Sequence, residues 1–181
     1  LDIVQAFPTG TCGGQYIYNV TTVSPPVIDY LQIVDWTDNE NSIEVVLENP
    51  NSGNYEYSID GITYQESSFF TNLIYGYYTV YVRDTSCGND SANALVLNYP
   101  KYFTPNGDGY NDYWRINFSE YEPNMKITIL DRFGKLITSF TSDSIGWDGT
   151  YNGRQLPSTD YWFVVNREDG RILKGHFAMK R

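Results

Sequence analysis

The sequence predicts an all-β protein that consists of two tandem β-sandwich modules of the Ig-like kind. Aromatic residues make up 17% of the chain, apolar and polar residues alternate with a period of two, and no segment carries a helical apolar period. Aromatic and β-branched side chains suit a pleated, half-buried surface. Alternation with a period of two is typical of a strand that buries one face.

This alternation places the strands of the first half of the chain. Strands are expected at residues 43–47, 55–59, 77–82 and 94–99. Asp60-Gly61 follows the second of them and is a turn dipeptide, because both residues tolerate the backbone of a tight hairpin. The run from Asn49 to Gly53 ends the first strand with turn-forming residues.

Two hairpins are predicted in the second half of the chain. Residues 125–130 are expected to pair with 135–140, and residues 161–167 with 171–179. Each link contains a glycine, Gly134 or Gly170, where a hairpin turn or bulge needs a positive φ. Trp147, which stands among turn residues, is expected to plug one end of the second sandwich.

Charge divides the chain into two parts. Residues 1–99 hold 12 acidic residues and one basic residue, Arg83, whereas residues 100–181 hold 10 acidic and 11 basic residues. Such a shift indicates two modules with different surroundings. We expect the tail of a preceding repeat over residues 1–26, an Ig-like β-sandwich repeat over 27–99, and a second module over 100–181.

The two cysteines are 75 residues apart and have similar neighbours in the sequence. This similarity suggests that they stand one repeat length apart. Thr11-Cys12-Gly13-Gly14 resembles Ser86-Cys87-Gly88-Asn89. A disulfide between Cys12 and Cys87 would fit an oxidising compartment. However, equivalent positions of adjacent repeats need not bring the two Cα atoms within the ~7 Å that a disulfide requires. The sequence therefore leaves open whether Cys12 and Cys87 form a disulfide.

Several classes of function are disfavoured. The acidic first half lacks the clustered Lys and Arg that bind phosphate, so no nucleic acid is expected as a partner. No apolar run is long enough to span a membrane. His176 is the only histidine and belongs to no recognisable catalytic constellation, so we expect no enzyme and no catalytic residue. The chain opens without a signal peptide, and we expect it to be the C-terminal part of a longer exported protein.

A glycine-rich loop is the sharpest local motif. It contains two glycines and four side chains that are candidate calcium ligands: Asn106, Asp108, Asn111 and Asp112. Short Asp and Asn side chains separated by glycine can place their oxygens around Ca²⁺. The spacing departs from an EF-hand, because Tyr110 stands at a ligand position and no Glu follows in register. The alternative is a turn held by side-chain hydrogen bonds to its own backbone. Apart from this calcium, no cofactor is expected.

Taken together, the motifs of the second half resemble a known family. The segments that carry the resemblance are NYPKYFTPNGDGYNDYW (98–114), ITILDRFGK (127–135), WDGTYNG (147–153), LPSTDYW (156–162) and KGHF (174–177). In this order they are similar to the gliding-motility-associated C-terminal domain, which is the type B sorting domain of the type IX secretion system of Bacteroidetes. The resemblance covers residues 99–181. Thr159 stands where sorting domains of the other type often carry glycine, which favours type B.

The resemblance implies a role that composition does not show. Such a domain is recognised in the periplasm by the type IX translocon and directs its protein across the outer membrane. The implied partners are translocon components and an outer-membrane protein of the PorP/SprF-like class, and the implied location is the cell surface or the extracellular space. The family has no catalytic residues. Segments 55–61 and 78–84 resemble repeats that precede this domain in large cell-surface adhesins.

We expect the translocon to read the last hairpin, residues 161–181, by surface docking or by addition of an edge strand. The candidate contact residues are Arg171, Lys174, His176, Lys180 and Arg181. The leading function is therefore a non-catalytic signal domain on a gliding or attachment adhesin. The alternative is a carbohydrate-binding module of a secreted polysaccharide-degrading enzyme, because the Tyr-rich strands offer rings on which sugars can stack.

Overall fold

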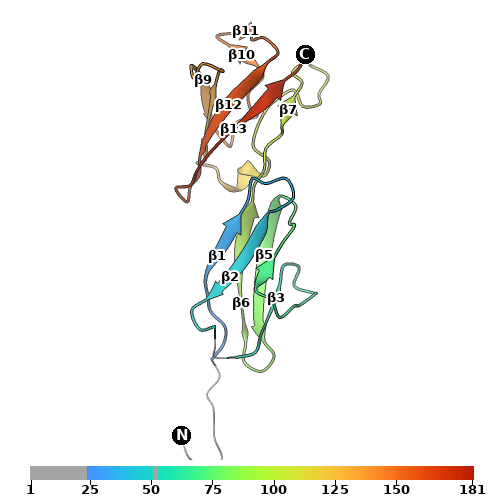
Figure 1. Ribbon diagram of the computed structural model, residues 1–181, viewed down its shortest axis with the longest axis vertical. Coiled ribbons are helices and arrows are strands. Elements are labelled where there is room, and N and C mark those ends of the chain that lie inside the picture. The colour runs from blue at the N-terminus through green and yellow to red at the C-terminus, as the bar shows by residue number, and fades with distance from the viewer. Residues whose placement is uncertain (1–23, 51–52) are drawn as a thin grey trace, which may run out of the picture.

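The computed structural model describes residues 24–50 and 53–181, which form an all-β molecule, as predicted. Helical structure in this part of the chain is limited to one short 3₁₀ turn, η1 (Ser119–Tyr121). The described residues form two units that stand end to end, with the C-terminal unit above the N-terminal unit in Figure 1. The expected tail of a preceding repeat lies almost wholly outside the described residues. The Ig-like character of the two units stays a prediction.

The N-terminal unit contains two three-stranded antiparallel sheets. One has the order β1 (Ile28–Val34), β2 (Ser42–Leu47), β4 (Phe69–Phe70), and the other β3 (Tyr55–Ser58), β5 (Gly76–Asp84), β6 (Asn89–Val96). Apolar side chains of both sheets share one core, in which Ile43, Val80 and Val96 are fully buried. Burial of these alternate positions explains why the sequence alternates.

The C-terminal unit is built on one five-stranded sheet. Its order is β7 (Tyr102–Phe103), β13 (Ile172–Met179), β12 (Asp160–Asn166), β8 (Lys126–Leu130), β9 (Leu136–Thr141). Only the β7–β13 pair is parallel. A separate small hairpin consists of β10 (Thr150–Tyr151) and β11 (Arg154–Gln155). Both predicted hairpins are confirmed as β8–β9 and β12–β13.

Aromatic packing fills the core of the C-terminal unit. Trp114 stacks on Phe177 with ring centroids 3.9 Å apart, and Phe163 lies 5.1 Å from Trp114. The backbones of Trp114 and Trp147 exchange two hydrogen bonds of 2.9 and 3.0 Å, which hold both indoles against the sheet. Trp147 is 4% exposed, so its predicted place in the core is confirmed.

The strand predicted at residues 94–99 was wrong at its end. β6 ends at Val96, which lies in the core of the N-terminal unit, whereas Leu97 lies in the core of the C-terminal unit. The backbone of Leu97 leaves the ladder because its N–H donates to Asp35 Oδ2 at 3.2 Å and its carbonyl accepts the N–H of Trp36 at 3.1 Å. The chain therefore passes from one core to the other within a single peptide bond.

Replacing Gly146 with alanine should destabilise the protein strongly. Gly146 has a φ of +110°, and a Cβ there would lie 2.7 Å from the carbonyl oxygen of Trp114. We expect the free energy of unfolding to fall by about 2–3 kcal/mol, measured by urea denaturation. Gly153→Ala is the matched control: its φ is +73° and no atom lies within 4 Å, so it should cost only about 1 kcal/mol. Equal losses would contradict the steric account.

Candidate interaction surface

Two of the five residues predicted to contact a partner lie on the open face of the five-stranded sheet. Lys174 and His176 are exposed there, and His176 stands directly across from Trp162 on β12. The two rings lie 6.0 Å apart, centroid to centroid. Leu130 and Leu136 continue this row across β8 and β9, so an apolar band ends at His176. We call Leu130, Leu136, Trp162 and His176 the outer row.

The other three predicted residues make contacts within the protein. Arg181 donates from its guanidinium to the carbonyl oxygens of Pro105, Gly149 and Leu156, and so joins three loops. Lys180 places its Nζ 4.7 Å from the ring centroid of Tyr102. In the part of the chain that the structure describes, Lys174 has no hydrogen bond, ion pair or ring contact of its side chain, and His176 contacts the ring of Trp162 on the open face.

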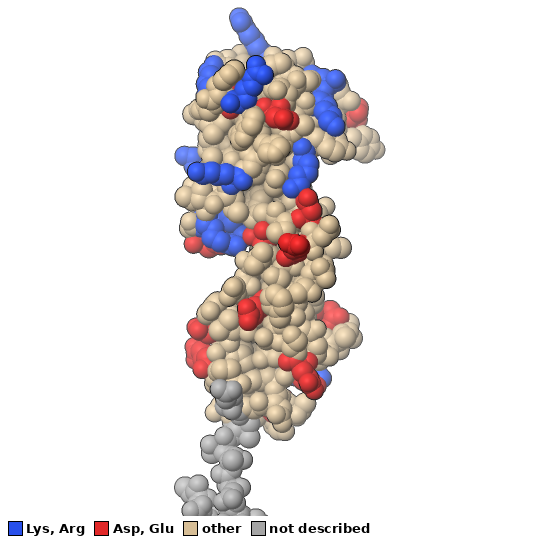
Figure 2. Space-filling model, in the orientation of Figure 1, with Lys and Arg blue, Asp and Glu red and all other residues tan. Residues whose placement is uncertain are grey.

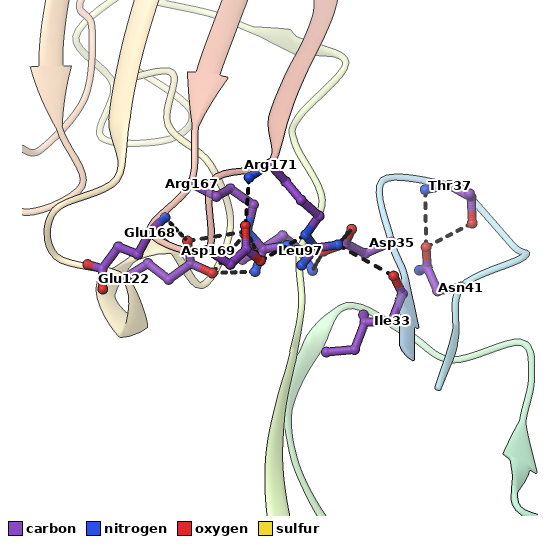
Figure 3. A network of polar contacts seen from close by, with 10 residues as sticks. All are labelled: Ile33, Asp35, Thr37, Asn41, Leu97, Glu122, Arg167, Glu168, Asp169 and Arg171. Atoms are coloured by element: carbon purple, nitrogen blue, oxygen red, sulfur yellow. Dashed lines mark hydrogen bonds and ion pairs between the residues drawn. The ribbon is translucent and has the colours of Figure 1, made fainter. Parts of the chain in front are cut away.

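Arg171 takes part in a polar network between the two units, which Figure 3 shows in close-up. Its Nε lies 2.8 Å from Asp169 Oδ2, and one terminal nitrogen lies 3.2 Å from Asp35 Oδ1. The same nitrogen donates to the carbonyl of Ile33 at 3.4 Å. Arg171 therefore ties the last hairpin to the N-terminal unit, a role that sequence reasoning missed.

Arg167 is the centre of this network. Its side chain is 2% exposed and lies 2.7 Å from Asp35 Oδ2, which is 2% exposed as well. On its other side the guanidinium pairs with Glu122, whose carboxylate accepts hydrogen bonds from Nε and from one terminal nitrogen. Two buried carboxylates thus share one buried cation, a geometry that satisfies charges removed from water.

Burial sets the protonation behaviour of the network. Burial raises the pKa of Asp35 above its usual value, although Arg167, Arg171 and the N–H of Leu97 act in the opposite sense. Charging Asp35 therefore costs free energy in the folded chain, so its contribution is most favourable at low pH and declines as pH rises through the folded pKa. Burial opposes the charge of Arg167, but Glu122 and Asp35 keep the pKa of this guanidinium above its usual value. Arg167 therefore stays charged in the network.

Aromatic side chains flank the network and join the units further. Tyr77 of the N-terminal unit stacks on Tyr121, with centroids 4.6 Å apart. Trp36 lies 5.9 Å from Tyr99 and 6.2 Å from Phe163. Together with the buried charges, these contacts indicate a fixed junction between the units rather than a flexible linker.

The loop of the candidate calcium ligands is held by its own hydrogen bonds. Asp112 accepts N–H groups from Asn106, Gly107 and Gly109 at 2.7–3.0 Å. Those from Gly107 and Gly109 are the main cause of a lowered Asp112 pKa. Asp108 accepts the N–H of Tyr110 at 2.8 Å and the side-chain amide of Asn106 at 2.8 Å.

These bonds form the side-chain-to-backbone turn that was the alternative to a calcium site. The structure therefore brings Asn106, Asp108 and Asp112 together. For Asn111 it shows a φ of 51° and a carbonyl that accepts the N–H of Thr104. Within residues 24–50 and 53–181, no group of three or more His, Cys, Asp or Glu is placed to hold a metal ion. Calcium binding at the loop stays a prediction.

The remaining sequence predictions concern the cysteines and the membrane. Cys12 lies outside the described residues, so the predicted pair with Cys87 stays untested. Cys87 follows β5, and its N–H donates to Asp84 Oδ1 at 2.9 Å. Among the described residues, no helix is both long and apolar enough to cross a bilayer.

Comparison with protein families gives one match. Residues 97–177 match the model of the CHU_C type IX secretion signal domain, which confirms the domain predicted from the sequence. The matched segment begins at Leu97, the residue at which the chain enters the second core. A comparison with curated proteins found no significant match.

Solved structures show only distant likeness. The 47-kilodalton lipoprotein Tp47 of Treponema pallidum is 10% identical, with 90% of this chain and 53% of that chain covered and a TM-score of 0.31. Dimeric latent PorU from Porphyromonas gingivalis is 18% identical, with 86% and 20% covered and a TM-score of 0.31. The Bacteroides ovatus glucan-locus protein SGBP-B is 16% identical, with 80% and 41% covered and a TM-score of 0.25. This chain thus spans about half of the first protein and less of the others, and TM-scores this low support no conclusion about it.

Replacing Arg167 with methionine should weaken the whole molecule. The change keeps much of the side-chain volume but leaves Asp35 and Glu122 without the buried cation. We expect a loss of about 3–5 kcal/mol in the free energy of unfolding, measured by urea denaturation. Arg83→Met is the control, because the Arg83 and Glu56 side chains are 44% and 33% exposed and their ion pair should be worth about 1 kcal/mol or less. A loss from Arg167→Met as small as that of the control would contradict the role of the network.

Proposed function

Because its C-terminal unit is a type IX secretion signal domain, we propose that this chain directs a large cell-surface protein, a gliding or attachment adhesin, across the outer membrane. The single observation that carries the proposal is the family match over residues 97–177, which coincides with a unit that has its own core. The proposed route runs through the periplasm. The proposed partners are translocon components and a PorP/SprF-like outer-membrane protein, as the type B resemblance implies.

The geometry of the two units supports a role at the end of a larger protein. They stand end to end and are joined by buried charges (Figure 1). The signal unit is therefore held at one end of an elongated molecule. On the face shown in Figure 2, Lys and Arg side chains gather on the signal unit, while the N-terminal unit shows mainly acidic ones. A partner that carries negative charge would be attracted to the signal unit rather than to the acidic unit behind it.

A signal role also agrees with the surroundings of His176. In the described part of the chain its ring lies 6.0 Å from that of Trp162, and no hydroxyl or carboxylate forms a hydrogen bond with it. In a catalytic triad, by contrast, a carboxylate orients the histidine and the nucleophile lies within hydrogen-bond reach of its ring. We therefore propose a non-catalytic function for the unit.

Export can be tested with a secreted reporter. The 181-residue chain is fused behind a periplasmic export signal and a fluorescent protein, and it is expressed in a bacterium with a type IX system. We expect the reporter at the cell surface or in the medium, and in the periplasm when the chain is omitted or the translocon is inactivated. Periplasmic retention of the fusion in the intact strain would overturn the proposal. A deletion of 175–181 is unsuitable, because it removes Phe177 and Met179 from the core.

One surface of the N-terminal unit favours a second candidate, a carbohydrate-binding module. Tyr30, Gln32, Glu44 and Phe69 share the outer face of the β1–β2–β4 sheet, since Gln32 pairs with Glu44 and Glu44 with Phe69. Tyr30 is 52% exposed and Phe69 47%. Exposed rings beside polar groups on one face of a sheet are suited to stacking against sugars.

The second candidate predicts glycan binding that depends on the two rings. We expect a glycan array probed with the whole chain to show bound polysaccharides, and the variant Tyr30→Ala/Phe69→Ala to lose at least about tenfold in affinity, as removal of stacked rings does. Tyr110→Ala, which removes another exposed ring far from this sheet, is the control. An array without binding, or binding that survives the double substitution, would reject this candidate.

A further inference from the structure

One edge of the central hairpin is open along most of its length. β7, the neighbour of β13 on that side, pairs only with Ala178 and Met179. The order of the sheet places β12 on the other side of β13, where all seven pairs from Asp160 to Asn166 are formed. Figure 1 shows β7 beside the C-terminal end of β13. Residues 172–176 therefore have a strand on one side only.

The direction of their backbone groups follows from the hydrogen bonds at the paired end. The N–H of Ala178 donates to the carbonyl of Lys101, on the side away from β12, at 2.9 Å. In an antiparallel pair, residues two apart direct their N–H and C=O groups to the same side. The N–H and C=O groups of Ile172, Lys174 and His176 consequently face away from β12 as well. The register of the hairpin is continuous from 172 to 178, so no bulge reverses this direction.

Nothing in the described part of the chain satisfies these groups. No hydrogen bond joins the backbone N–H or C=O of Ile172, Lys174 or His176 to a residue of 24–50 or 53–181 outside the hairpin. The side chains of all three are exposed, Ile172 to 60%. Such an edge is a template for another strand unless it is short, charged or covered. Here a single Lys174 supplies the charge.

The edge selects its occupant by charge as well as by backbone geometry. If a second copy of the chain paired antiparallel over the full edge, Lys174 would stand opposite Lys174, and like charges directly opposite each other are destabilising. A segment with Asp or Glu opposite Lys174 would instead gain an ion pair across the strands. The charge pattern thus favours an acidic segment of a different protein over self-association.

We propose that the export partner of this unit donates an extended, acidic segment that adds a strand to the open edge of β13 and pairs with Ile172, Lys174 and His176. The inference rests on the proposed export function and specifies how the partner is bound. The added strand would lie on the same side of β13 as β7, next to the residues that precede Ala178. Main-chain hydrogen bonds then supply affinity, while Lys174 and the outer row around Trp162 supply specificity.

The test removes one outward N–H without disturbing the hairpin. In Lys174→Pro the lost N–H faces away from β12, so every bond to β12 is retained, and proline is tolerated at such edge positions. We expect export of the reporter fusion to fall about tenfold, the effect of losing one well-formed backbone hydrogen bond at an interface. Lys174→Ala should export within about twofold of the wild-type chain, because it keeps the N–H.

Two further variants make the result specific. Thr141→Pro is the matched control on β9, at the opposite edge of the same sheet. The N–H of Ser142 donates to Met125, so that of Thr141 faces away from β8, and export should be unchanged. Lys174→Glu keeps the backbone but opposes an acidic segment, so export should fall. If thermal unfolding shows that Lys174→Pro does not fold, Lys174→Glu becomes the test of strand addition.

The outcomes separate this inference from the export function itself. Failure of the wild-type fusion to leave the periplasm would overturn the export function. Wild-type export together with unchanged export of folded Lys174→Pro, or of Lys174→Glu, would overturn strand addition alone. Equal loss in Lys174→Ala and Lys174→Pro would also overturn it, because docking would then depend on the side chain.

Discussion

The buried guanidinium of Arg167 is the contact on which the arrangement of the molecule depends. It lies between Asp35 of the N-terminal unit and Glu122 of the C-terminal unit, with both ion pairs largely out of water. A buried triad of this kind is weak evidence for stability but defines relative position well, since any shift leaves a charge unpaired. The end-to-end geometry and the commitment of Arg171 to the junction both follow from it.

This junction determines which part of the last hairpin can meet a partner. The turn between β12 and β13 lies against the N-terminal unit, because Arg167 and Arg171 both reach Asp35. The opposite end of β13 is occupied by β7 and by the contacts of Arg181 with three loops. The middle of the strand, with Lys174 and His176, is what remains accessible. These contacts at both ends leave residues 172–176 as the part of the edge that the proposed strand addition would use.

Local patterns in the sequence were enough to predict the hairpins but not the junction. Gly134 and Gly170 adopt the positive φ that their turns need, and the strands on either side pair as the alternation indicates. The pairing of Trp162 with His176 follows from the same register and was available to sequence reasoning. Arg167 and Asp35, however, are 132 residues apart, and no local pattern connects them. Burial of an arginine depends on partners that only the fold brings together.

The same reasoning explains why charge in the sequence did not reveal the contacts that two members of the predicted contact set make within the fold. Arg171 and Arg181 look like surface cations in the sequence, but each satisfies carbonyl or carboxylate oxygens of distant segments. A folded signal recognised through backbone groups needs few fixed side chains, because N–H and C=O groups are present whatever the residue. The proposed strand addition requires an edge that stays unpaired, and the two-residue length of β7 leaves such an edge on β13. The feature of the β12–β13 hairpin that matters for the proposed partner is thus the point at which β7 ends.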